Sequence, residues 1–158
     1  MKKFKIYLAA PLFSVGEREF NNRLTVALRK RIPELSFIMP QKYASLVHRQ
    51  DGFAEKIFEY CIESIRKADA VLCILDGADV DSGTCIEMGY AYACRKPIVG
   101  VRTDFRGSEE RGVNLMVSKV CREMVWLPDS CLTESDVIKE IAGALKHVLS
   151  EYVTRFQN

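Results

Sequence analysis

The stretch ADAVLCILDGADVDSGTCIEMGYAYAC, residues 68–94, decides the fold. Its residues 70–75 are continuously apolar and partly β-branched, which is typical of a strand buried on both faces of a parallel sheet. A polar, glycine-bearing turn follows, and residues 84–94 then predict a helix of small side chains with a carboxylate, Glu87, in its first turn. Because open α/β sheets bind ligands at the carboxyl ends of their strands, we expect Asp81 and Glu87 beside one cleft.

Strands and helices alternate outward from this stretch. The apolar patterns predict further strands at 5–9, 36–39 and 97–101, a possible short strand at 124–127, and helices at 14–31, 53–67 and 135–152. Residues 43–52 are expected to be irregular. The charged segment 103–112 predicts a mobile loop that borders the pocket as a lid, with its glycines as hinges. The alternation predicts a doubly wound α/β fold, in which helices cover both faces of a mostly parallel, five-stranded sheet.

Length and composition are those of an ordinary globular protein. The 158 residues, 48% of them hydrophobic and 28% charged, predict a single domain over 1–158. Lysines and arginines are scattered with a net charge of +2, so no nucleic-acid groove is indicated. Only a short apolar run precedes Pro11, and no segment approaches the length of a membrane span. We therefore expect a cytoplasmic protein with neither a nucleic-acid nor a membrane partner.

The six cysteines are dispersed along the chain, and they indicate buried free thiols rather than a disulfide framework. They form no Cys-x-x-Cys pair, and the chain has only two histidines. This pattern predicts a reducing compartment and no metal site.

Common catalytic signatures are missing, which leaves the carboxylates. The chain contains no Gly-x-Gly-x-x-Gly, no Walker-type phosphate loop and no Gly-x-Ser-x-Gly elbow. Two acids at one cleft can cleave a glycosidic bond, one as nucleophile and the other as the group that handles the proton of the leaving group. A nucleobase leaving a sugar fits this scheme.

Each candidate also has an ordinary structural explanation. Thr84-x-x-Glu87 fits a capping box in which Glu87 only bonds a backbone N–H. Asp81 fits an Asx turn, Tyr7 a core tyrosine with a satisfied hydroxyl, and Asn114 a loop residue.

Taken together, these segments resemble the nucleoside 2-deoxyribosyltransferase family. Four motifs carry the resemblance in the family's order, and they span most of residues 5–116: IYLAAPLF (6–13), ADAVLCILDG (68–77), DSGTCIEMGYA (81–91) and GVNLM (112–116). The resemblance implies a flavodoxin-like fold. It also implies that 2-deoxyribose moves between nucleobases through a retaining, ping-pong mechanism without metal or organic cofactor.

The family's roles transfer to matching residues. Glu87 corresponds to the nucleophile that forms a deoxyribosyl ester, and Tyr7 to the residue that orients it. Asp81 corresponds to the acid that handles the proton on the base. Asn114 is expected to reach the sugar's 5′-hydroxyl from a neighbouring subunit, and Gln41 to contact the base.

Three further residues of the motif regions, Phe13, Gly83 and Met116, are expected to line the substrate site. The implied partners are a 2′-deoxynucleoside, a free nucleobase and further copies of this chain, because family members are homo-oligomers with shared active sites. The choice between purine and pyrimidine depends on the pocket around Leu12, Phe13 and Gln41.

One residue departs from the family pattern. Members commonly carry an aspartate eight residues ahead of the aspartate of the Ala-Asp-Ala-Val match, where this chain has Cys61. In the family that acid helps to hold the sugar, so its loss predicts weaker sugar recognition or altered substrate choice. Restoring it with Cys61→Asp is expected to leave activity equal or higher.

Two other functions fit the same residues. One is hydrolysis, as in the similar 2′-deoxynucleoside 5′-monophosphate N-glycosidases, for which Ser14 and Ser118 are available as phosphate donors. The other is a nucleotide-sensing module without catalysis, in which Glu87 is only a helix cap.

Overall fold

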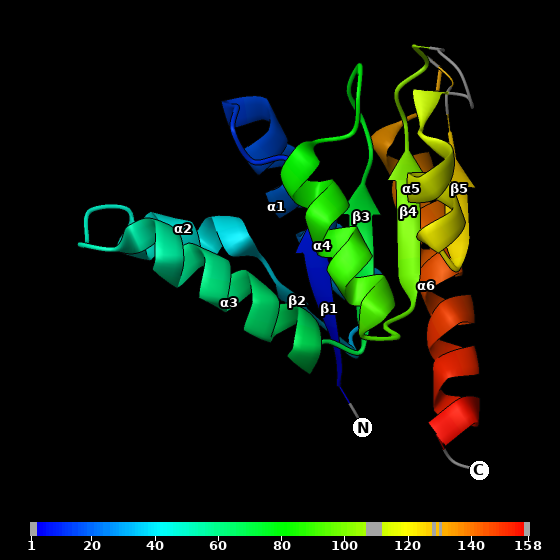
Figure 1. Cartoon of the computed structure of the whole chain (residues 1–158). Coiled ribbons are helices and arrows are strands. Elements are labelled where there is room, and N and C mark those ends of the chain that lie inside the picture. Colours follow the sequence, from blue (N-terminus) through cyan, green and yellow to red (C-terminus); the bar gives the residue numbers. More distant parts are fainter. Residues whose placement is uncertain (1–2, 107–111, 128, 130, 157–158) are drawn as a thin grey trace.

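The computed structural model describes residues 3–106, 112–127, 129 and 131–156. Strands and helices alternate through most of these ranges (Figure 1). In chain order the elements are β1 (Phe4–Ala9), α1 (Val15–Arg31), β2 (Leu35–Ile38), α2 (Pro40–Val47), α3 (Phe53–Lys67), β3 (Ala70–Ile74), α4 (Ser82–Ala93), β4 (Ile98–Arg102), α5 (Leu115–Val120), β5 (Glu123–Trp126) and α6 (Glu134–Phe156).

The strands form one sheet in the order β2-β1-β3-β4-β5, and all four pairings are parallel. This confirms the predicted flavodoxin-like class. Every residue of β3 is buried, as its apolar run predicts. The chain winds from β1 out to β2 and returns to β3 on the other side of β1. The strand order therefore reverses between β1 and β3, which is where such sheets bind ligands.

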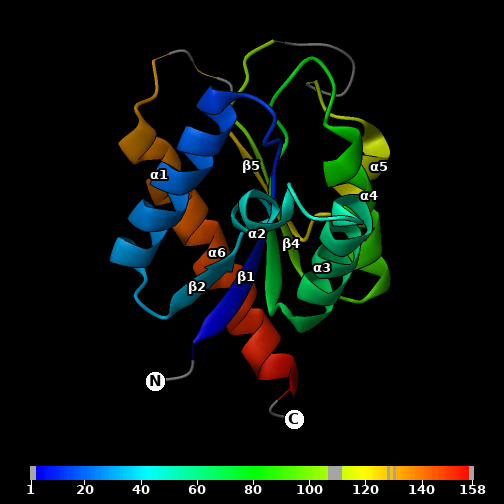
Figure 2. The same ribbon diagram turned by 90° about the vertical axis from the view of Figure 1, so that its left-hand side faces the viewer.

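Helices cover both faces of the sheet (Figure 2), and an apolar core holds them there on each face. Leu24 and Leu28 of α1 and Ile141 and Leu145 of α6 pack on one face. The opposite core takes its side chains from α3, α4 and α5. It also includes Tyr7, so the inward side chains of β1 on this face reach α3 and α4.

The structure corrects the sequence prediction at two places. Residues 43–47, expected to be irregular, belong to helix α2, which Pro40 begins at its first position. A second unpredicted helix, α5, follows Asn114. Both helices are short and bury few side chains, so each offers too few residues for a sequence pattern to identify it. No helix in the described ranges is both long and apolar enough to cross a membrane.

Helices α2 and α3 project together beyond the edge of the sheet (Figure 1). The rings of Tyr43 and Tyr60 stack between them, with centroids 4.0 Å apart and an interplanar angle of 8°. Stacking of this kind adds about 0.5–1.5 kcal/mol to the burial of the rings.

Candidate active site

A tyrosine from β1 and a glutamate from α4 meet at the carboxyl edge of the sheet. The Tyr7 hydroxyl donates a hydrogen bond of 2.6 Å to Oε1 of Glu87. Tyr7 is fully buried, and its pKa lies far above the usual value because burial and the Glu87 charge both disfavour a phenolate. Its hydroxyl therefore remains protonated and fixes one carboxylate oxygen of Glu87.

Burial is also the main influence on Glu87. It raises the pKa of this carboxyl to about 7, and the negative charge of Asp81 acts in the same direction. Hydrogen bonds from Tyr7 and Cys61 partly oppose this rise. A carboxylate that is poorly solvated but oriented by donors suits attack on a positively polarised carbon.

Asp81 is the N-cap residue of helix α4. Its Oδ2 accepts hydrogen bonds from the backbone N–H of Thr84 at 2.8 Å and from the Thr84 hydroxyl at 3.0 Å. Gly83 leaves room for this carboxylate, since a Cβ at that position would lie 3.1 Å from Oδ2. The side chain is thus held at the helix N-terminus, where the helix dipole favours its charge.

This geometry overturns the capping-box explanation of Glu87. The helix begins at Ser82 with Asp81 as its N-cap, so Thr84 is the third helical residue and Glu87 the sixth. Glu87 lies in the second turn, not the first. Its carboxylate is directed to Tyr7 rather than to an unpaired backbone N–H.

Cys61 belongs to the same cluster. It lies on α3, and its thiol interacts by hydrogen bonding with the side chains of both Tyr7 and Glu87. Burial raises the pKa of the thiol to about 11, so it is neutral beside Glu87. Within the described ranges, no three His, Cys, Asp or Glu side chains are arranged to hold a metal ion.

An unpredicted network anchors the loop that carries Asp81. Asp76, directly after β3, accepts hydrogen bonds from the backbone N–H groups of Thr103 and Asp104 and from the Thr103 hydroxyl. In return, Asp104 Oδ2 accepts from the N–H of Gly77 at 3.1 Å. The loops after β3 and β4 are therefore joined. The only sequence signal for this network was an aspartate at the end of a buried strand.

Arg102 also joins the loops that follow β3 and β4. It is fully buried at the end of β4, and its guanidinium donates to the carbonyl oxygens of Leu75 and Arg106. Gly112 packs against it with a φ of 83°, and a Cβ there would lie 2.7 Å from an Arg102 nitrogen. Only glycine fits this position. The proposed lid covers 103–112: residues 107–111 lie outside the described residues, while Thr103 and Asp104 are tied to Asp76.

Gln41 lies in the first turn of α2, and its side-chain amide forms hydrogen bonds with helix α1. Its amide oxygen accepts from Asn21 Nδ2 at 3.0 Å, and its Nε2 donates to Arg18 O and Asn22 Oδ1 at 3.1 Å each. A contact with the base would have to share or replace one of these bonds, so this role stays a prediction. Phe13 is 74% exposed and is not covered by the rest of the chain.

Asn114 and Met116 form no hydrogen bond with Tyr7 or Glu87 within the described part of this chain. Asn114 is the N-cap of α5, where its Oδ1 accepts the Met116 N–H at 2.8 Å. The Met116 side chain is 72% exposed. Exposure at this edge agrees with the expectation that these residues serve a neighbouring copy, which stays a prediction.

A family model and one curated relative match most of this chain. The model of the nucleoside 2-deoxyribosyltransferases matches residues 6–116. An uncharacterized protein of Ureaplasma parvum is 28% identical over 166 residues, covering 95% of this chain and 97% of its own length.

Solved structures share the fold. A 2-deoxyribosyltransferase from Bacillus psychrosaccharolyticus superposes with a TM-score of 0.63 at 23% identity, over 84% of this chain and 95% of that one. A CMP N-glycosidase of Clostridium botulinum gives 0.56 at 15% identity, over 90% and 98% of the two chains. At these identities the similarity concerns the fold alone.

Proposed function

The chain belongs to the nucleoside 2-deoxyribosyltransferase family, and on that basis we propose that it transfers 2-deoxyribose from a 2′-deoxynucleoside to a free nucleobase. One observation carries the proposal: the half-buried Glu87 carboxylate, oriented by the Tyr7 hydroxyl at 2.6 Å. Asp81 is close enough for its charge to act on Glu87. The proposed roles are nucleophile for Glu87, positioning donor for Tyr7 and proton carrier for Asp81.

In the first half-reaction, Glu87 attacks the anomeric carbon of the deoxynucleoside. A new C–O bond forms to the carboxylate, the C–N bond to the base breaks, and its electron pair leaves with the base. Asp81 takes up a proton from solvent and passes it to that base. Without a 2′-hydroxyl, the sugar reaches an oxocarbenium-like transition state more easily, and the neighbouring carboxylate stabilises its positive charge.

In the second half-reaction, a different base attacks the same carbon. The C–O bond breaks, Glu87 leaves as a carboxylate, and Asp81 accepts the proton that the incoming base loses. Two displacements retain the β configuration. The scheme requires no metal or organic cofactor.

Hydrolysis of a nucleotide is the second candidate, suggested by the fold shared with a CMP N-glycosidase. A 5′-phosphate needs donors, and the two serines considered for it have other partners. Ser14 Oγ accepts the Glu17 N–H at 3.1 Å in the capping box of α1, and Ser118 Oγ donates to Leu115 O at 2.9 Å. The Ser118 proton is therefore engaged, whereas the Ser14 hydroxyl can still donate. The match at Asn114-Leu-Met supports a substrate with a free 5′-hydroxyl.

Chromatography of substrate mixtures tests the proposal directly. The purified chain is incubated with 2′-deoxyinosine, with and without adenine, beside mixtures that contain a pyrimidine deoxynucleoside or a deoxynucleoside 5′-monophosphate. Deoxyadenosine formed only when adenine is present would establish transfer. Free base and sugar from the monophosphate alone would instead indicate the hydrolase, and nucleotide binding without any turnover would indicate a sensor.

The transfer rate is expected to rise with pH and to reach half its plateau near pH 7. Glu87 attacks only as a carboxylate, and burial raises its pKa to about 7. The measurement is kcat/KM for 2′-deoxyinosine between about pH 5 and pH 9. Tyr7→Phe removes a hydrogen bond that lowers this pKa, so its midpoint should lie higher. A flat profile, or equal midpoints in both proteins, would contradict this assignment.

The proximity of Cys61 to Glu87 revises the expectation for Cys61→Asp from equal or higher activity to a pH-dependent change. A second carboxylate beside Glu87 disfavours its ionisation by like-charge repulsion, so the variant should be slower than the native chain at pH 7. Above about pH 8.5, where Glu87 is ionised in both, activity should be equal or higher. Cys61→Ser, which stays neutral, is the control. Equal activity of Cys61→Asp and native protein at every pH would show that position 61 does not act on Glu87.

A homo-oligomer with shared sites is part of the proposal. Phe13 and Met116 are each more than 70% exposed, and both belong to the matched motifs. Covering them with a second copy would remove apolar surface from water and place Asn114 at a neighbouring site.

A further inference from the structure

A cavity of about 700 Å³ opens at the amino-terminal edge of the sheet, opposite the edge that carries Glu87. It is enclosed by the last turns of α4 and α5, the end of α6 and the first residues of β4. The size is suitable for a small-molecule ligand. None of the four motifs that carry the family resemblance lines this cavity, and the proposed reaction does not involve it.

Cationic side chains outnumber carboxylates around the cavity, and one of them, Lys96, already donates from Nζ to the Ala68 carbonyl oxygen at 2.8 Å. Four cationic side chains line it, Arg95, Lys96, Lys119 and Arg122, together with one carboxylate, Glu151. That carboxylate already accepts hydrogen bonds of 2.9 and 2.8 Å from the Arg122 guanidinium. In the described part of the chain, Arg95 and Lys119 take part in no ion pair. An anion is the complementary ligand.

Aromatic and apolar groups form the remaining wall. Tyr92 lines the cavity and is 61% exposed, and Tyr152 lines it from α6. Ile98 and Val148 contribute buried aliphatic surface. Tyrosine rings beside cations suit a ligand that combines a planar ring with a phosphate group.

The backbone at Arg95 supports a role for its side chain. Helix α4 ends in a Schellman-type turn, in which Arg95 N donates to Tyr92 O and Lys96 N donates to Ala91 O, each at 2.9 Å. Arg95 has a φ of 56°, and no other non-glycine residue of the described chain has a positive φ. Glycine is the usual residue at this position of the turn. Arginine is less favourable than glycine for the backbone at this position. Its presence is therefore explained by what its side chain does and not by the turn.

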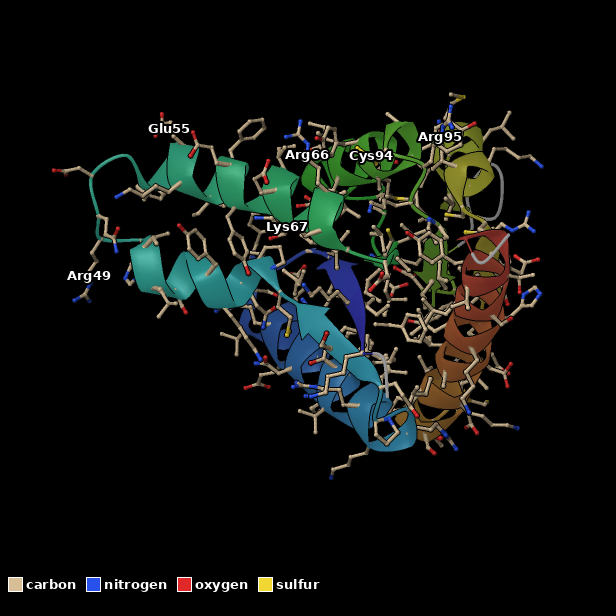
Figure 3. The ribbon with its side chains drawn as sticks, turned by 90° about the horizontal axis from the view of Figure 1, so that it is seen from below. Arg49, Glu55, Arg66, Lys67, Cys94 and Arg95 are labelled. Carbon is tan, nitrogen blue, oxygen red and sulfur yellow. The ribbon has the colours of Figure 1, made fainter. Side chains whose placement is uncertain are left out.

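We propose that this cavity binds a nucleotide, with its phosphate groups at Arg95 and Lys119 and its base against Tyr92. Arg95 lies at the end of α4 on the underside of the molecule, next to α5 (Figure 3). The site is separate from the Tyr7–Glu87 pair. The proposal therefore holds or fails independently of deoxyribosyl transfer.

Calorimetric titration of the full chain with dATP and with tripolyphosphate tests the proposal. We expect dATP to bind at least tenfold more tightly than tripolyphosphate, because only dATP offers both the ring and the phosphates. Arg95→Gly should weaken dATP binding at least tenfold. Its melting temperature should be equal or higher, since glycine favours a positive φ, so lost binding cannot be attributed to unfolding.

Arg49→Ala is the matched control. It removes the same charge at the tip of the α2–α3 projection, far from the cavity (Figure 3), and should leave dATP binding unchanged. Equal binding by the native chain and Arg95→Gly, or equal losses in both variants, would overturn the proposal. Tripolyphosphate binding as tightly as dATP would overturn the assignment to a nucleotide, as would no dATP binding at millimolar concentration.

Discussion

Glu87→Gln is expected to lower deoxyribosyl transfer by at least about 10³-fold, equivalent to roughly 4 kcal/mol of transition-state stabilisation. Glutamine keeps the shape of the side chain and can still accept the Tyr7 hydrogen bond. It cannot form the sugar ester, because an amide is a poor nucleophile at this carbon. The loss should therefore appear in kcat, with binding of the deoxynucleoside largely retained.

The same variant should be more stable than the native chain at alkaline pH. Burial raises the pKa of Glu87 from 4.5 to about 7, so the native fold favours the protonated form. The contribution of Glu87 to stability is thus present below about pH 4.5 and lost as the pH rises through 7. The shift corresponds to at most about 3 kcal/mol, and solvent access to the half-buried carboxylate reduces this to about 1–2 kcal/mol.

Thermal unfolding and transfer assays on one preparation test both expectations. The melting temperature of Glu87→Gln should exceed that of the native chain at about pH 8, and the two should agree at about pH 4.5. Glu55→Gln, an exposed carboxylate near the tip of the α2–α3 projection, is the control and should change neither quantity (Figure 3). Retained transfer by Glu87→Gln would refute the role of Glu87 as nucleophile. A variant less stable than the native chain at pH 8 would refute the claim that the buried Glu87 charge destabilises the fold.

Asp81→Asn should lower transfer by about 10²–10⁴-fold without unfolding the protein. Asparagine is as good an N-cap as aspartate and can still accept hydrogen bonds from Thr84, so α4 should begin at the same residue. An amide cannot carry the proton to the departing base. The variant also removes a charge that raises the pKa of Glu87, so the midpoint of its residual activity should move to lower pH.

Substrates with different leaving groups distinguish two causes of a slow Asp81→Asn variant, the loss of proton transfer and a displaced substrate or side chain. A deoxyribosyl donor whose leaving group departs as a stable anion needs no proton, so Asp81→Asn should use it nearly as well as the native chain does. Asp81→Ala, which also loses the cap, should additionally lose about 1 kcal/mol of stability. An Asp81→Asn variant equally slow with both kinds of donor would exclude the proton-carrier role.

The sheet could be predicted from sequence because its strands are strongly patterned. The apolar run at 70–75 indicated a fully buried central strand, and Ser14 with Glu17 located the start of α1. Helices α2 and α5 could not be predicted in the same way. Each has eight residues or fewer and lies mostly at the surface, so packing against neighbours decides its conformation.

The sequence indicated Tyr7, Asp81 and Glu87 as candidates but not their geometry. Tyr7 and Glu87 are 80 positions apart, and only the folded chain brings their oxygens to 2.6 Å. The start of α4 was misassigned because Thr84-x-x-Glu87 imitates a capping box, while Asp81 is the actual cap. Asp76 and Arg102 were missed because their partners are carbonyl and N–H groups of the backbone, which leave no side-chain pattern.

The bonds between Asp76 and the segment after β4 also bear on how this protein could be redesigned. Asp76 holds the N–H groups of Thr103 and Asp104, and Arg102 bridges the carbonyl oxygens of Leu75 and Arg106. An engineer who wishes to change substrate choice by loop grafting should therefore exchange both loops together. A graft of either loop alone would remove one partner of each hydrogen bond between the two loops and leave buried polar groups without their partners.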